Sequence, residues 1–211
     1  MAALSSLRAS FCTPLLLMLL LVPGYLAAQA CMSGVGPLSS SHGLSGQFIS
    51  KEHSRGFGAS VWMERPAGRF LRAGATVLRP RRTSLTEVNL DVQLGKVLHP
   101  SGSREVSLCP SMLVGAVLLD GGLSWRTSVG LLSAFTLARP SSVREVGLLT
   151  GAAIEYARTS LESLAPEAYG SFDLGAFYRF SRCVASAAVG QLHMGRDRND
   201  PSVRLVASLC L

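Results

Sequence analysis

The chain has 211 residues, 20 Lys and Arg against 13 Asp and Glu, and a formal charge of +7. Its basic residues are scattered, and only "RPRR" at 79–82 is dense, so the contiguous basic surface typical of nucleic-acid binding is missing. We therefore expect no nucleic-acid partner. Two interpretations of "RPRR" stay open, a solvated loop or a contact with anionic lipid headgroups or lipopolysaccharide.

Residues 1–30 have the layout of a secretory signal peptide. Arg8 is their single charge, an apolar run extends over 15–22, and "AQA" at 28–30 supplies the small residues of a cleavage site. The run is shorter than the roughly 20 apolar residues that a membrane-spanning helix needs. We predict cleavage after Ala30, with lipidation of Cys31 as an alternative. Residues 31–42, rich in Gly and Ser, are predicted to form a flexible lead.

From about residue 43 to 211, apolar and polar residues alternate with a period of two, and no long helical pattern appears. In the segment 87–94, for example, Val and Leu alternate with Glu, Asn, Asp and Gln, which places all apolar side chains on one face of a strand. Segments rich in Gly and Pro separate the alternating runs. The pattern predicts about ten strands, at 44–51, 57–63, 71–77, 87–94, 112–119, 123–137, 145–156, 171–180, 184–194 and 202–211.

Alternating strands fit either a soluble barrel or sandwich with an apolar interior or a membrane barrel with an apolar exterior. Lys is scarce, occurring only at Lys51 and Lys96, whereas soluble surfaces usually carry many. The polar face is rich in Gly, Ala and Ser and carries isolated charges, as expected of a narrow lumen. These charges are Arg72, Asp91, Arg126, Glu155, Asp173 and Arg204.

Aromatic residues on the apolar face fall into two sets once the strands are threaded up and down. One set contains Phe57, Trp125, Tyr156 and Phe172, and the other contains Phe135, Tyr178 and Phe180. Two aromatic girdles are typical of membrane barrels. Three residues do not fit this pattern: Trp62 and Phe70 fall on the polar face, and Phe177 interrupts the alternation. We predict an all-β fold, an antiparallel up-and-down transmembrane β-barrel of about ten strands over 43–211, with eight strands as the alternative.

Four cysteines remain after the predicted cleavage, and an even number in an exported chain indicates two disulfides. Ten-strand threading places Cys31 in the lead, Cys109 in the connection before the fifth strand, Cys183 at the start of the ninth and Cys210 at the end of the tenth. Cys183 and Cys210 are nearly equidistant from the turn between the last two strands, so an antiparallel hairpin brings them together. We predict the pair Cys183–Cys210 and, by elimination, Cys31–Cys109.

The signal ending in "AQA", the repeated alternation and the closing "VRLVASLCL" together resemble the small bacterial outer-membrane β-barrels, the class of OmpA-like and OmpX-like domains. The last strand is similar to the C-terminal signal recognised by the barrel-assembly machinery, although such strands usually end in an aromatic residue and this one has Leu211. The resemblance implies a location in the bacterial cell outer membrane. It also implies contact with outer-membrane lipid and lipopolysaccharide, and with the barrel-assembly machinery during biogenesis.

Sequence motifs for catalysis or cofactor binding are not found, and we predict no catalytic residue, no metal ligand and no cofactor. The four His, at 42, 53, 99 and 193, lie singly in or near turns, where we expect them to be solvated. The lipid A deacylases among outer-membrane barrels pair a His and a Ser two apart on a strand, but His193 is followed by Met194 and Gly195. The inward carboxylates are interpreted as charge partners of inward Arg. They are Asp91, Glu145, Glu155 and Asp173.

These observations favour a structural, adhesive or envelope-interaction role without evident catalysis, with an unidentified small-molecule ligand binding the extracellular loops 159–169 and 196–201. A general porin is not expected, because barrels of eight to ten strands leave little room for a channel. A soluble periplasmic or secreted lipid-binding β-barrel is the alternative. A lipid A modifying enzyme is the third hypothesis.

Overall fold

Ten long strands make up almost all of the part of the chain that the computed structural model describes. The described residues are 42–65, 68–81, 86–100, 105–119, 122–159, 167–181, 183–194 and 199–211. The predicted signal peptide (1–30) and residues 31–41 of the lead lie outside them. The strands are β1 (His42–Lys51), β2 (Ser54–Arg65), β3 (Arg69–Pro80), β4 (Glu87–Lys96), β5 (Val106–Leu119), β6 (Gly122–Ala138), β7 (Glu145–Thr159), β8 (Glu167–Arg179), β9 (Val184–Met194) and β10 (Asn199–Cys210).

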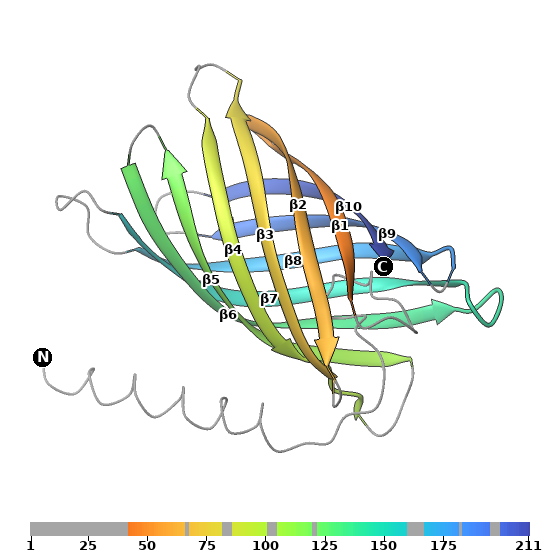
Figure 1. The fold of residues 1–211 in the computed structure, drawn as a ribbon. Coiled ribbons are helices and arrows are strands. Elements are labelled where there is room, and N and C mark those ends of the chain that lie inside the picture. The colour runs from red at the N-terminus through yellow and green to blue at the C-terminus, as the bar shows by residue number, and fades with distance from the viewer. Residues whose placement is uncertain are drawn as a thin grey trace, which may run out of the picture.

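Each strand pairs antiparallel with its neighbours in the chain, and β1 pairs with β10 to close the barrel (Figure 1). The prediction of an up-and-down barrel is confirmed, with ten strands and not eight. Because β1 begins where β10 ends, with Gly43 opposite Cys210, both lie at the same end of the barrel. We call it the terminal end, and the opposite end, where β1 stops at Lys51, the far end.

The two faces of each strand differ in polarity as the sequence predicts. In β4, Leu90, Val92 and Leu94 point outward and remain exposed, whereas the Asn, Asp and Gln between them are buried in the interior. Similar rows of exposed Leu, Val, Ile and Phe cover the outer face of the other strands. The outside of the barrel is therefore its apolar side.

The outward aromatic residues occur towards both ends of the barrel. Phe57, Trp125, Tyr156 and Phe172 are exposed on the halves of their strands nearer the far end. Near the terminal end, the rings of Tyr178 and Phe180 contact each other with centroids 4.6 Å apart. The two sets lie where the sequence places them.

The interior near the terminal end contains a cluster of buried apolar side chains, which we call the plug, and Lys96, Glu145 and Arg179 are buried at the same end. Trp62, Phe70 and Phe177 are each 2–3% exposed at its centre. The space for Phe177 depends on Gly147 of the adjacent strand, where a Cβ would lie 2.4 Å from the Phe177 ring. These three aromatics do not fit the sequence pattern because they face inward. All three belong to one cluster of buried apolar side chains. The remaining members of the plug are Val97, Cys109, Ala134, Leu149, Ala185, Ala187 and Val189.

One boundary differs from the prediction at the plug. β5 begins at Val106, so Cys109 lies inside the strand and not in the connection before it. The strand extends because Leu98 and Leu108 exchange two backbone hydrogen bonds of 2.8 Å, which hold the incoming chain alongside. Pro110, which disfavours a strand in a sequence, is tolerated at the start of β5.

Candidate functional site

A polar chamber of about 470 Å³ occupies the barrel interior above the plug. It extends to strand ends at the far end, since Lys51 and Glu87 are among its lining residues. Its volume is in the range of small-molecule sites, which is roughly 300–1,000 Å³. Other polar lining residues include Gln47, Thr76, Asn89, Gln93, Ser111, Ser124, Ser128, Ser171, Gln191 and Ser202.

All six charges that the sequence assigns to the lumen line this chamber. They come from six different strands and converge because each lies on the inner face of its own strand. Arg204 forms an ion pair with Asp173, with Nη2 and Oδ1 3.4 Å apart. Arg72 donates from Nε to Ser60 Oγ at 3.1 Å and is attracted by Asp91.

Arg126 differs from the other two arginines. It makes no hydrogen bond or ion pair within the described part of the chain, and its Nε is buried without a partner. Its side chain lies beside Gly115 of the neighbouring strand, where a Cβ would come within 3.0 Å of Arg126 Nε and 2.8 Å of the Leu90 carbonyl oxygen. A glycine at 115 therefore leaves the room that the arginine occupies.

A His–carboxylate pair stands nearer the far end. His193 Nδ1 lies 3.8 Å from Glu155 Oε1, and the His193 ring contacts the Tyr169 ring edge-on. Ser171 is directly opposite His193 in the β8–β9 register, but no hydrogen bond joins Ser171 to His193. The distance between His193 and Glu155 is too long for a hydrogen bond, and among the described residues no serine is hydrogen-bonded to His193 as a nucleophile would be.

The side chains of two histidines are less exposed to solvent than we expected from the sequence. His193 lies on the inner face of β9 with its side chain 20% exposed, because it belongs to the strand predicted at 184–194 and its side chain lines the chamber. His99 is partly buried and its Nδ1 lies 3.2 Å from the carbonyl oxygen of Val106. His53 is exposed beside Glu52, as expected.

The fourth predicted carboxylate, Glu145, lies at the terminal end and not in the chamber. It contacts Arg139 Nε at 2.9 Å and Arg179 Nη1 at 3.5 Å. Arg179 is buried, so Glu145 partly compensates a charge that would otherwise be costly there. The interpretation of inward acids as partners of inward Arg holds for Glu145 and for Asp173.

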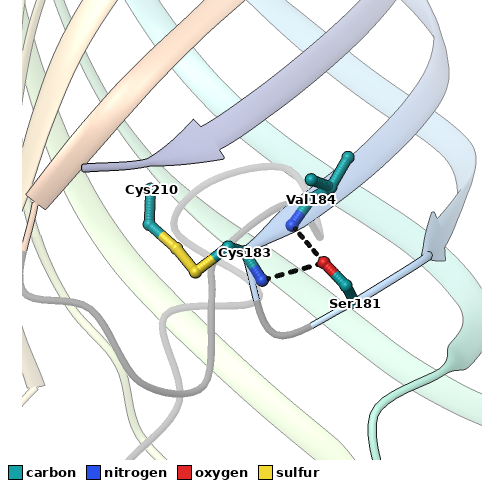
Figure 2. Close-up of a disulfide and its surroundings, with 4 residues drawn as sticks. All are labelled: Ser181, Cys183, Val184 and Cys210. Atoms are coloured by element: carbon teal, nitrogen blue, oxygen red, sulfur yellow. Dashed lines mark hydrogen bonds between the residues drawn. A yellow bond between two sulfur atoms is a disulfide. The ribbon is translucent and has the colours of Figure 1, made fainter.

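The disulfide Cys183–Cys210 is present at the terminal end, with Cα atoms 4.9 Å apart. Figure 2 shows Ser181 Oγ accepting hydrogen bonds from the backbone N–H groups of Cys183 and Val184, at 3.2 and 3.1 Å, which fix the turn before β9. Cys109 is disulfide-bonded as well. Cys31 lies outside the described residues, so the pairing Cys31–Cys109 stays a prediction.

Within the described ranges, no three His, Cys, Asp or Glu side chains are grouped so that they could hold a metal ion. The same ranges contain no helix long and apolar enough to cross a membrane. Of the loops 159–169 and 196–201, the predicted ligand sites, residues 160–166 and 196–198 lie outside the described residues. The rest of these two ranges belongs to β7, β8 and β10, so the loops are shorter than predicted.

No protein-family model matches the chain, and no curated protein matches it. Solved structures similar to it are bacterial outer-membrane β-barrels. One of them is a loop L8 deletion mutant of OmpT, an outer membrane protein of Vibrio cholerae, with a TM-score of 0.40 and 9% sequence identity. The match covers 77% of this chain, and this chain spans only 58% of the length of that protein. LpxR from Salmonella typhimurium gives 0.47 and 10% identity, covering 84% of this chain and 86% of LpxR. Ail, the attachment invasion locus protein of Yersinia pestis, gives 0.32 and 12%, covering 80% and 93%.

Proposed function

We propose that this protein is an outer-membrane β-barrel with an envelope-interaction role, which offers its far end to the cell exterior and does not conduct solutes. The observation that carries the proposal is the apolar outer face of the closed barrel, combined with a polar interior.

The outer face is unsuited to water. Ile154 is 72% exposed, Leu174 66% and Phe57 70%, and each belongs to a row of exposed apolar residues. Soluble monomers rarely expose contiguous apolar patches beyond a few hundred Å². The strands have 10–17 residues, and a tilted strand needs about 9–11 to cross the hydrocarbon layer. A bilayer is therefore the environment that fits this surface.

The polar chamber argues against the soluble lipid-carrier alternative. A carrier would enclose its lipid in an apolar cavity, whereas ionised side chains, three Arg, Lys51 and four acidic residues, interrupt the Leu, Val and Ile side chains that line this cavity. The plug supports a non-conducting barrel, because Trp62, Phe70 and Phe177 fill the lumen beneath the chamber. Ions crossing the barrel would have to displace packed aromatic rings.

A basic patch at the far end supports contact with lipopolysaccharide. Arg55 and Arg79 are directly opposite on β2 and β3, both exposed on the outer face, and exposed Arg81 follows. Like charges directly opposite on a sheet destabilise it. A phosphate between them removes that cost, and the neighbouring Phe57 fits the interfacial level where lipid phosphates lie.

The membrane location is tested by expressing the full chain in a Gram-negative host and separating membrane fractions. We expect recovery in the outer membrane, gel migration that changes on heating, and no conductance in planar lipid bilayers. Recovery in the soluble fraction without detergent would overturn the membrane assignment. Stable channels of the unmodified protein would overturn the non-conducting barrel.

The lipopolysaccharide contact has a matched control within the same strand pair. Arg65 and Arg69 form a second opposed, exposed pair on β2 and β3, but at the terminal end. We expect R55Q/R79Q to reduce the lipopolysaccharide that remains bound to barrels extracted in mild detergent, and R65Q/R69Q to leave it unchanged. Equal loss in both variants would indicate general charge attraction and contradict the patch.

A further inference from the structure

Three arginines line the same chamber, Arg72 on β3, Arg126 on β6 and Arg204 on β10. Arg126 and Arg204 oppose the positive charge of Arg72, and Asp91 attracts it. These strands are distant in the chain and around the barrel, so the cluster forms across the lumen. Like charges in a partly water-excluded space are unfavourable unless an anion lies among them.

Pairing with carboxylates does not use up this positive charge. The chamber lining contains four Lys and Arg (Lys51 and the three arginines) and four carboxylates, so complete pairing is possible by number. The contacts are different, however. Glu155 lies beside His193, Glu87 accepts from Asn89 at 2.6 Å, and Asp91 attracts Arg72 but forms no hydrogen bond or ion pair with it.

Donor groups of the cluster are left without partners. The Nε atoms of Arg126 and of Arg204 are both buried and lack a hydrogen-bond acceptor within the described residues. Arg204 reaches Asp173 only at 3.4–3.5 Å, which is long for a charge-assisted hydrogen bond. Guanidinium forks match the oxygen geometry of phosphate and carboxylate groups, and buried unmet donors favour such an acceptor.

We propose that the chamber binds a small soluble oxyanion, a compound bearing a phosphate or a carboxylate, held by Arg72, Arg126 and Arg204. The volume of about 470 Å³ admits a ligand of sugar-phosphate size. Entry from the cell exterior rests on the proposed function, which places the far end outside the cell. The position of the three arginines in the lining of the chamber does not depend on it.

The test is isothermal titration calorimetry of the full-length folded barrel in a zwitterionic detergent, with inorganic phosphate and glucose 6-phosphate as probes. We expect saturable binding, and an about tenfold loss in R126Q and in R204Q, the equivalent of one hydrogen bond to a charged group. Arg158 supplies the control, since it lies on the outer face of β7 near the far end. R158Q removes the same charge and should bind as the unmodified protein does.

Asp91 gives a test of opposite sign. Asp91 faces the same chamber and repels an oxyanion, so D91N should tighten binding by about threefold or more, a change of under 1 kcal/mol. Gel migration before and after heating shows that each variant is folded. Absence of binding, or equal loss in R158Q, overturns the site. A folded barrel that inserts in membranes but binds neither probe refutes this inference alone, whereas a soluble barrel that binds phosphate refutes only the membrane assignment.

Discussion

The plug and the chamber are two halves of one barrel interior, built by the same ten strands and surrounded by the same apolar outer face. In the plug, aromatic and aliphatic side chains are 1–6% exposed and fill the lumen. In the chamber, charged and amide side chains line a cavity. The strand period fixes which side chains point inward, but it leaves the inner face free to be a packed core or a binding cavity.

The largest expected effect comes from emptying the plug. Phe177→Ala removes a side chain that is 2% exposed, and we expect the free energy of unfolding to fall by about 3–5 kcal/mol. Urea unfolding in lipid vesicles measures it, with Trp62 fluorescence reporting on the plug in a Trp125→Phe background. Phe172→Ala, on the outer face of the same strand, should cost much less. Equal costs would remove the distinction between plug and outer face.

The outer face that both halves share is tested next. Leu174→Arg places a charge on the apolar outer face of β8, and we expect a loss of about 2–4 kcal/mol in vesicles if that face contacts lipid, as we propose. Gln191 lies opposite Asp173 in the register and faces the chamber, so Gln191→Arg is the inner-face control. The prediction is contradicted if the control is as costly as Leu174→Arg.

The disulfide sharpens the comparison at the plug end. Replacing Cys183 and Cys210 together by Ser removes a cross-link that spans 27 residues, and we expect a loss of about 2 kcal/mol. The hairpin already holds its ends together, so we place the effect at the low end of measured disulfides. Urea unfolding without reductant measures it, because this variant keeps the disulfide of Cys109, and an unchanged unfolding midpoint would contradict the prediction. A further shift on reduction would show that another disulfide contributes.

The smallest effect is expected in the chamber. Asp173→Asn weakens the long ion pair with Arg204, and since the pair borders a cavity, we expect a change below about 1 kcal/mol. The same urea titration measures it. A loss as large as that of Phe177→Ala would mean that the chamber contributes to stability as the plug does.

Much of the fold could be predicted from the sequence, because period-two alternation is a local property. The ten strands, the inward direction of Arg72, Asp91 and Arg126, and the pair Cys183–Cys210 all follow from alternation and hairpin spacing. The chamber charges were identifiable for the same reason.

The plug could not be predicted in this way. Trp62, Phe70 and Phe177 interrupt the alternation of apolar and polar residues in the sequence. They belong to one buried cluster that joins β2, β3 and β8 across the lumen. Contact across a barrel depends on strand tilt and stagger, which alternation does not encode. That Arg126 has no hydrogen-bond or ion-pair partner among the described residues also depends on the three-dimensional arrangement, because the equal numbers of opposite charges that the sequence assigns to the lumen would indicate complete pairing.

The seam between β1 and β10 differs in kind from the other nine strand pairings. Gly43 and Cys210 meet there from opposite ends of the described chain, so this pairing has by far the highest contact order and closes the largest loop. The Cys183–Cys210 bond ties β10 to the β9 side of that seam. The disulfide thus links the last strand covalently to its own hairpin. If two neighbouring strands of the barrel separate, we expect them to be β1 and β10.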